Sequence, residues 1–183
     1  LGTVTLTGDL TAVAVGALTS RDNVSVAGNA NLQGASIDVG NQAGDTVNFG
    51  SLTFTSSGVV TVSEDSATTF KGTSSGSTIT VNSTGVMADA EADAANEVAG
   101  TNLTLTAVGG IGVGAAPIHV AIVNLDVSNA TSGSIFVTDT AGGVTLTNLG
   151  GPNANAVSGV GGAGEIRSSG LLTIAANAIT SGG

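Results

Sequence analysis

Pairs of apolar residues separated by one residue recur along the whole chain, with short clusters of turn-forming residues between them. The stretch "DTVNFGSLTFTSSGVVTVSEDS" at 45–66 shows the pattern, with Gly50 and then Ser56-Ser57-Gly58 between successive pairs. A period of two indicates strands with one face turned inward, and the Gly and Ser clusters indicate turns. The chain is therefore predicted to be all-β, as a sandwich, a barrel or a solenoid. The pairs are Val4/Leu6, Val13/Val15, Val24/Val26, Ile37/Val39, Val47/Phe49, Leu52/Phe54, Val60/Val62, Ile79/Val81, Leu103/Leu105, Ile111/Val113, Ile118/Val120, Leu125/Val127, Ile135/Val137, Val144/Leu146 and Leu172/Ile174.

Internal repetition favours the solenoid. Three Thr-x-Thr triplets are centred on Phe54, Ile79 and Leu105. Their nearly even spacing suits one full coil of a parallel β-helix. Coils stacked about 4.8 Å apart let each short strand bury its inward face against the coils above and below. We predict roughly seven coils of about 25 residues, with Phe54, Ile79 and Leu105 stacked as one inward ladder.

Composition agrees with a thin, elongated core. The 183 residues include four Phe but no Trp, Tyr or Cys, whereas compact domains of this length normally anchor their cores with several large aromatics. The chain has three basic residues and 13 acidic residues. This balance excludes nucleic-acid binding, and an anionic membrane surface would repel the chain. This acidic, Lys-poor, Cys-free composition fits a secreted bacterial surface protein, and we expect an extracellular or cell-surface location.

The chain is expected to form a single solenoid segment over 1–183, with two interruptions. Residues 87–100, "MADAEADAANEVAG", are predicted to be an insertion loop or a short helix, and residues 148–165 a Gly- and Asn-rich loop. The uncharged stretch 107–123 is short for a membrane span and alternates, so no span is predicted. Because the chain starts at Leu1 without a visible signal peptide, we expect it to be part of a longer polypeptide.

A family resemblance adds to this interpretation. "GDTVNFGSLTFTSSGVVTVSEDSATTFKGTSSGSTITVNSTGVM" and the later "GTNLTLTAVGGIG" and "SGSIFVTDTAGGVTL" resemble the repeat units of giant bacterial β-strand-repeat surface proteins. These are similar to filamentous-haemagglutinin-type β-solenoid adhesins. The resemblance covers roughly residues 20–180, and 87–100 departs from it. It implies a right-handed parallel β-helix, a secreted or cell-surface location, and a structural or adhesive role.

Two motifs are candidates for ligand binding. "GIGVGA" at 110–115 matches a dinucleotide fingerprint, but Pro117 and another alternating run follow where that motif needs a helix, so Gly turns between coils are favoured. Asp89, Glu91, Asp93 and Glu97 offer oxygens to Ca²⁺, but their spacing lacks the Gly and terminal Glu of an EF-hand loop. We expect a solvated acidic loop that protrudes and binds no metal tightly.

The remaining chemistry is sparse. His119 lies between Ile118 and Val120 on an alternating strand, so it is expected to point away from the core as a surface histidine. Two Arg, one Lys and one His are a poor set for a polysaccharide lyase or hydrolase. No catalytic, cofactor-binding or metal-binding residue is therefore predicted.

The predicted function is that of a non-enzymatic structural or adhesive segment of a secreted or cell-surface bacterial β-solenoid. The alternative is a subunit of an extracellular filament, because "TVTLT" at 3–7 and "LLTIAANAIT" at 171–180 lack the Lys, Pro or bulge that protects strand edges. A polysaccharide-active β-helix enzyme and an ice-binding solenoid with outward Thr ladders are less favoured. Expected partners are neighbouring repeats of the same chain, other copies meeting end to end, and cell-surface or matrix components.

Overall fold

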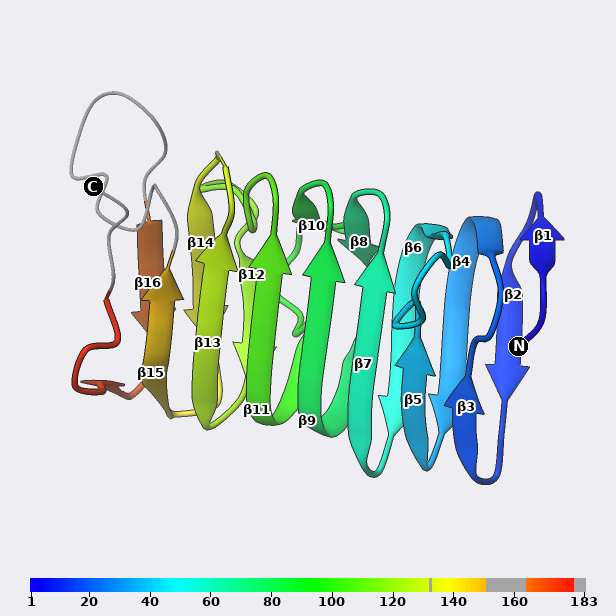
Figure 1. Cartoon of the computed structure of the whole chain (residues 1–183). Helices are drawn as coiled ribbons and strands as arrows, with labels where there is room; N and C mark the ends of the chain where they lie inside the picture. Colours follow the sequence, from blue (N-terminus) through cyan, green and yellow to red (C-terminus); the bar gives the residue numbers. More distant parts are fainter. Residues whose placement is uncertain (132, 151–163, 180–183) are drawn as a thin grey trace.

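The computed structural model describes residues 1–131, 133–150 and 164–179, and these form a β-solenoid of about seven turns. No helix occurs in these ranges. In Figure 1 the strands of the near wall run upward, those of the far wall run downward, and the coils advance from right to left. This winding is right-handed. The predictions of an all-β, right-handed parallel β-helix and of roughly seven coils are confirmed.

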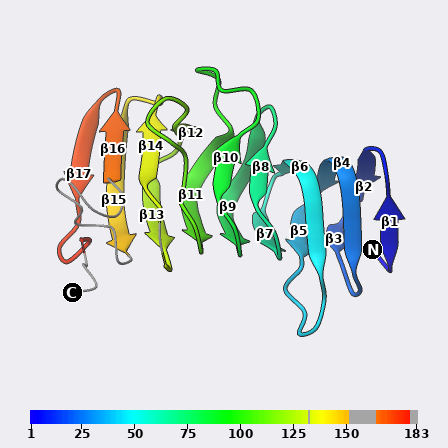
Figure 2. The same cartoon turned by 90° about the horizontal axis from the view of Figure 1, so that it is seen from above.

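Each coil is built from short strands joined by tight corners (Figures 1 and 2). The strands are β1 (Val4–Leu6), β2 (Leu10–Val13), β3 (Ala17–Thr19), β4 (Val24–Gly34), β5 (Ser36–Val39), β6 (Val47–Ser56), β7 (Val59–Glu64), β8 (Thr68–Phe70), β9 (Ser74–Ser83), β10 (Met87–Asp89), β11 (Val98–Ala107), β12 (Ile118–Ala121), β13 (Asn124–Asn129), β14 (Ile135–Asp139), β15 (Gly143–Gly150), β16 (Gly164–Ser168) and β17 (Leu171–Ile174).

The pairings between these strands are all parallel and join residues about one coil apart. Along the near wall they connect one inward residue per coil, which we call the near-wall ladder. The steps of this ladder are unequal, because the step from Leu146 to Ile174 is much longer in sequence than the step from Leu18 to Ile37. Coil length is therefore variable. The ladder consists of Leu18, Ile37, Val60, Ile79, Leu103, Leu125, Leu146 and Ile174.

The predicted ladder of Phe54, Ile79 and Leu105 is wrong. Ile79 pairs with Leu103, Leu105 pairs with Val81, and Phe54 lies on another wall opposite Leu32. The coil that starts at Ile79 and closes at Leu103 is longer than the preceding one, which starts at Val60 and closes at Ile79. Because corner lengths differ, a constant step of about 25 residues does not follow the register.

The interior is one continuous apolar cluster that runs the length of the stack. Inward residues alternate with outward ones along most strands. In β13, for example, Leu125 and Val127 are fully buried while their neighbours are half-buried. Phe54 and Phe70 are the largest fully buried side chains. Each fully buried Val, Leu or Ile contributes roughly 1.5–3 kcal/mol, so stacked aliphatic residues stabilise the core without many aromatics.

The walls meet at corners where backbone lies against backbone. A Cβ atom on Gly50, midway along the bent strand β6, would lie 2.0 Å from the carbonyl oxygen of Ala27 in the preceding coil. At Gly100, in the bent strand β11, the corresponding distance to the Gly76 carbonyl oxygen is 2.3 Å. These glycines let successive coils approach closely where the strand turns.

The two predicted interruptions fall at corners as well. Residues 87–89 and 98–100 belong to strands β10 and β11, and the connection between them stands out from the stack (Figure 2). Residues 91–95 of this connection are exposed. Of the predicted 148–165 loop, 148–150 end strand β15 and 164–165 begin strand β16, while 151–163 lie outside the described residues.

Candidate functional site

A cluster of Asp89, Glu97 and His119 lies where the 90–97 connection meets the far wall. Each residue offers one ligand atom, and these atoms all lie within 4.8 Å of one another. Asp89 ends strand β10, Glu97 immediately precedes strand β11, and His119 is the second residue of strand β12. Successive corners of the solenoid thus bring together residues that are distant in the sequence.

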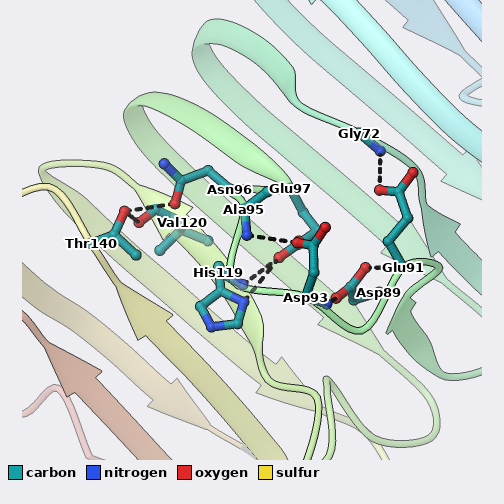
Figure 3. A network of polar contacts seen from close by, with 10 residues as sticks. All are labelled: Gly72, Asp89, Glu91, Asp93, Ala95, Asn96, Glu97, His119, Val120 and Thr140. Carbon is teal, nitrogen blue, oxygen red and sulfur yellow. Dashed lines mark hydrogen bonds and ion pairs between the residues drawn. The ribbon is translucent and has the colours of Figure 1, made fainter.

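Parallel register places His119 beside Glu97. Val98 pairs with Val120, so the preceding residues of the two coils are also neighbours. The Glu97 backbone N–H donates to the His119 carbonyl oxygen at 2.9 Å, and the His119 backbone N–H donates to the Glu97 Oε2 atom. In Figure 3 the imidazole and the Glu97 carboxylate face each other, and His119 Nδ1 is 3.8 Å from Glu97 Oε2.

The 90–97 connection covers this pair because neighbouring coils hold it in place. The Gly72 N–H donates to Glu91 at 2.8 Å, and the Thr140 hydroxyl donates to the Asn96 side chain at 2.6 Å. Asp89 accepts the N–H groups of Glu91 at 2.8 Å and Asp93 at 3.1 Å, which fixes the turn itself. The connection therefore lies over the far wall and shields what is beneath it (Figure 3).

Shielding changes the electrostatics of the cluster. The Glu97 side chain is 3% exposed and that of His119 is 12% exposed. Burial raises the pKa of Glu97 to about 7, the hydrogen bond from the His119 backbone acts in the opposite direction, and the charge of Asp89 adds to the rise. The cluster therefore places the Glu97 carboxyl group where water solvates it poorly, beside the half-buried Asp89.

The sequence-predicted residues are only partly brought together. Of the four acidic residues considered for calcium, Asp89 and Glu97 belong to the cluster, while Glu91 turns toward Gly72 and the Asp93 carboxylate accepts the Ala95 N–H at 2.6 Å. His119 does point away from the core, yet its side chain is covered by the acidic connection. The register of Val98 with Val120 is the signal that would have found this pairing.

The "GIGVGA" motif takes a structural place in the stack. Ile111 is buried and bridges Met87 and Ile135 of the neighbouring coils. Gly112 adopts a φ of +64°, and Val113 and Ala116 close a tight turn before strand β12. A strand therefore follows the motif, where a dinucleotide-binding unit has a helix.

A hollow of about 490 Å³ adjoins the cluster on the outer surface. Its lining is mainly apolar and includes Val86, Met87, Val113 and Phe136, and Asp89 belongs both to this lining and to the cluster.

A second carboxyl group is buried elsewhere in the stack. Glu64, at the end of strand β7, is 2% exposed, and burial raises its pKa to about 7.

Comparison of the chain with protein-family models, with curated proteins and with solved structures finds no match. In the described part of the chain, no helix is long and apolar enough to cross a bilayer.

Proposed function

We propose that the chain is a non-enzymatic structural or adhesive segment of a secreted or cell-surface bacterial β-solenoid protein. The observation that carries this proposal is the parallel pairing that links the described strands from Val4 in strand β1 to Ile174 in strand β17. Backbone hydrogen bonds directed along the axis couple each coil to the next, so the stack resists bending and unwinding. Such a stack holds or presents groups at fixed spacing.

The distribution of polar groups supports a non-enzymatic role. Arg21, Lys71 and Arg167 are spread over different coils. Arg167 is exposed and forms an ion pair with Glu165 at 2.7 Å. Lyases and hydrolases of polysaccharides instead converge carboxylates and basic groups on one cleft to stabilise developing charge. The sequence resemblance to β-strand-repeat surface proteins points in the same direction.

Surface labelling tests the location and adhesion tests the role. Antibodies raised against residues 1–183 should label intact cells that produce the protein, and labelling that requires permeabilised cells would contradict the proposal. Beads coated with the chain should adhere to matrix-coated surfaces if the segment is adhesive, and beads that carry an unfolded variant serve as the control. Release of reducing ends from polysaccharides by the purified chain would contradict the non-enzymatic role.

A second candidate function, a filament subunit, is favoured by the ends of the stack. Ile174 continues the near-wall ladder but is 54% exposed, and Leu171 in the same strand is 76% exposed. At the opposite end, Val13 is 67% exposed. Apolar strand edges of this kind pair readily with other strands.

A further inference from the structure

The strongest unexplained feature is the nitrogen of a covered histidine. The His119 side chain is nearly nine-tenths buried, and its Nδ1 atom has an accessible area below 1 Å². This atom has no hydrogen-bond partner. The atom faces the Glu97 carboxylate at 3.8 Å, which is too far for a hydrogen bond. A buried polar atom without a partner is unfavourable, so this geometry favours a group that bridges the two side chains.

The charge around this nitrogen favours a cation as its partner. Asp89 and Glu97 contribute ligand atoms within 4.8 Å, and the Asp93 carboxylate lies nearby in the same connection (Figure 3). Among the described residues, the ion pair formed by a Lys or Arg side chain is that of Arg167 with Glu165, so no Lys or Arg compensates Asp89 or Asp93. Negative charge that is crowded and poorly solvated attracts a positive ion.

The geometry points to a binding site for one divalent transition-metal ion, with Zn²⁺ as its best chemical match, formed by Asp89, Glu97 and His119. One imidazole nitrogen and two carboxylate oxygens suit Zn²⁺, which takes N and O ligands at about 2.0–2.2 Å. Ca²⁺ instead needs six to eight oxygens, whereas this cluster supplies two carboxylates and an imidazole nitrogen. Zn²⁺ holds its ligand atoms about 3.5 Å apart, so we expect the cluster to contract when the ion binds.

The site has a mechanical consequence for the solenoid. Asp89 and Glu97 bracket the 90–97 connection, while His119 belongs to the wall of the next coil. An ion bound by all three fastens the connection to the wall, in addition to the hydrogen bonds at Glu91 and Asn96. The sequence alone predicts no metal here, because the register that adds His119 to the acidic residues is not visible in it.

Titration of the full chain with Zn²⁺ tests the inference. After treatment with EDTA, calorimetry at a pH just above neutral should show one saturable Zn²⁺ site of micromolar dissociation constant. Co²⁺ used as a spectroscopic probe should give a visible d–d band. Zn²⁺ should also slow cleavage after the exposed Glu91 by a glutamate-specific protease. Ca²⁺ in place of Zn²⁺ should bind far more weakly.

Three variants separate coordination from general attraction. Asp89→Asn and His119→Gln should each weaken Zn²⁺ binding by about tenfold or more. Glu91→Gln removes one negative charge from the connection at a residue that is not a ligand, and its amide oxygen can still accept the Gly72 N–H. This variant should therefore bind Zn²⁺ like the unmodified chain. Circular dichroism confirms that each variant is folded. The inference is overturned if the unmodified chain shows no saturable Zn²⁺ site, if the three variants bind alike, or if Ca²⁺ binds as tightly as Zn²⁺.

Discussion

Two adjacent acidic residues at the end of strand β7 turn back to bond the backbone of strand β6. Glu64 accepts the Phe49 N–H at 2.8 Å, and Asp65 accepts the Val47 N–H at 2.8 Å. Glu64 is buried, and burial raises the pKa of its carboxyl to about 7. The folded chain therefore holds the proton of the Glu64 carboxyl group more tightly than the unfolded chain does. Ionisation of Glu64 consequently destabilises the folded state.

Stability should therefore fall as pH rises. The ordinary pKa of Glu is 4.5 and that of Glu64 is about 7, so the folded state binds more protons between these values and loses stability as pH rises through this window. Between about pH 5 and 8 the contribution of Glu64 to the free energy of unfolding should decrease by about 2 kcal/mol. Urea unfolding at a series of pH values across this window measures it.

Glu64→Gln isolates this contribution, because Gln keeps the hydrogen bond to Phe49 without a titrating group. The variant should show a flatter pH profile than the unmodified chain. Asp65→Asn removes a charge from the neighbouring position and should retain the fall, because Glu64 is intact. Parallel pH profiles for the unmodified chain and Glu64→Gln would show that Glu64 keeps an ordinary pKa.

The stability of the near-wall ladder should also depend on the absence of buried charge. Ile79 is fully buried between Val60 and Leu103. Ile79→Asp buries a carboxylate without a partner and should lower the free energy of unfolding by at least about 4 kcal/mol. Thr80→Asp places the same group outward on the same strand and should change it by less than about 0.5 kcal/mol. Equal urea midpoints for the two variants would contradict the assigned faces.

At the scale of the strand, the sequence predicts faces better than register. Alternation correctly predicts that Ile79, Leu103 and Leu105 point inward, because the side-chain period of a strand is two. A slip by one full period keeps every side chain on the same face, so Leu103 and Leu105 are equally good partners for Ile79 by residue type. Backbone hydrogen bonds do not distinguish them either. Corner lengths decide the register, and they vary from coil to coil.

The same reasoning explains what could be predicted of the cluster. The sequence predicts both the acidic connection and the outward direction of His119. Their contact depends on the pairing of Val98 with Val120, which an assumed step of about 25 residues misses. Once the register is known, His119 falls directly beside Glu97, and the ligand set changes from oxygens alone to oxygens with nitrogen.

Corner glycines provide a direct test of close coil packing. The backbone of Ala27 occupies the space that a Cβ on Gly50 needs, at a distance of 2.0 Å. Gly50→Ala should therefore lower the free energy of unfolding by about 1–3 kcal/mol. Gly16 has no heavy atom within 4 Å of the corresponding position, so Gly16→Ala should be neutral or slightly stabilising. Thermal unfolding of both variants makes the comparison, and a neutral Gly50→Ala would contradict the packing of this corner.

At the scale of the whole molecule, the described strands at the two ends of the stack pair with a neighbouring coil on one side. Among the described strands, β17 pairs on one side with β15, and β1 and β2 pair on one side with β4. The exposed Leu171 and Ile174 at one end and Val13 at the other add apolar surface to these edges. Because the strands of both ends run in the same direction, the last coil of one copy can continue into the first coil of another.

The isolated chain should therefore associate end to end as its concentration rises. Light scattering should show a mass that grows with concentration, and electron microscopy should show linear assemblies. Thr173→Lys places a charge on the exposed edge strand β17 and should block this growth. Thr104→Lys adds the same charge to an outward position in the middle of the stack, on β11, and should leave it unchanged. A strict monomer at high concentration would contradict the filament alternative and would leave the rod, continued by neighbouring repeats of the same chain, as the role of the stack.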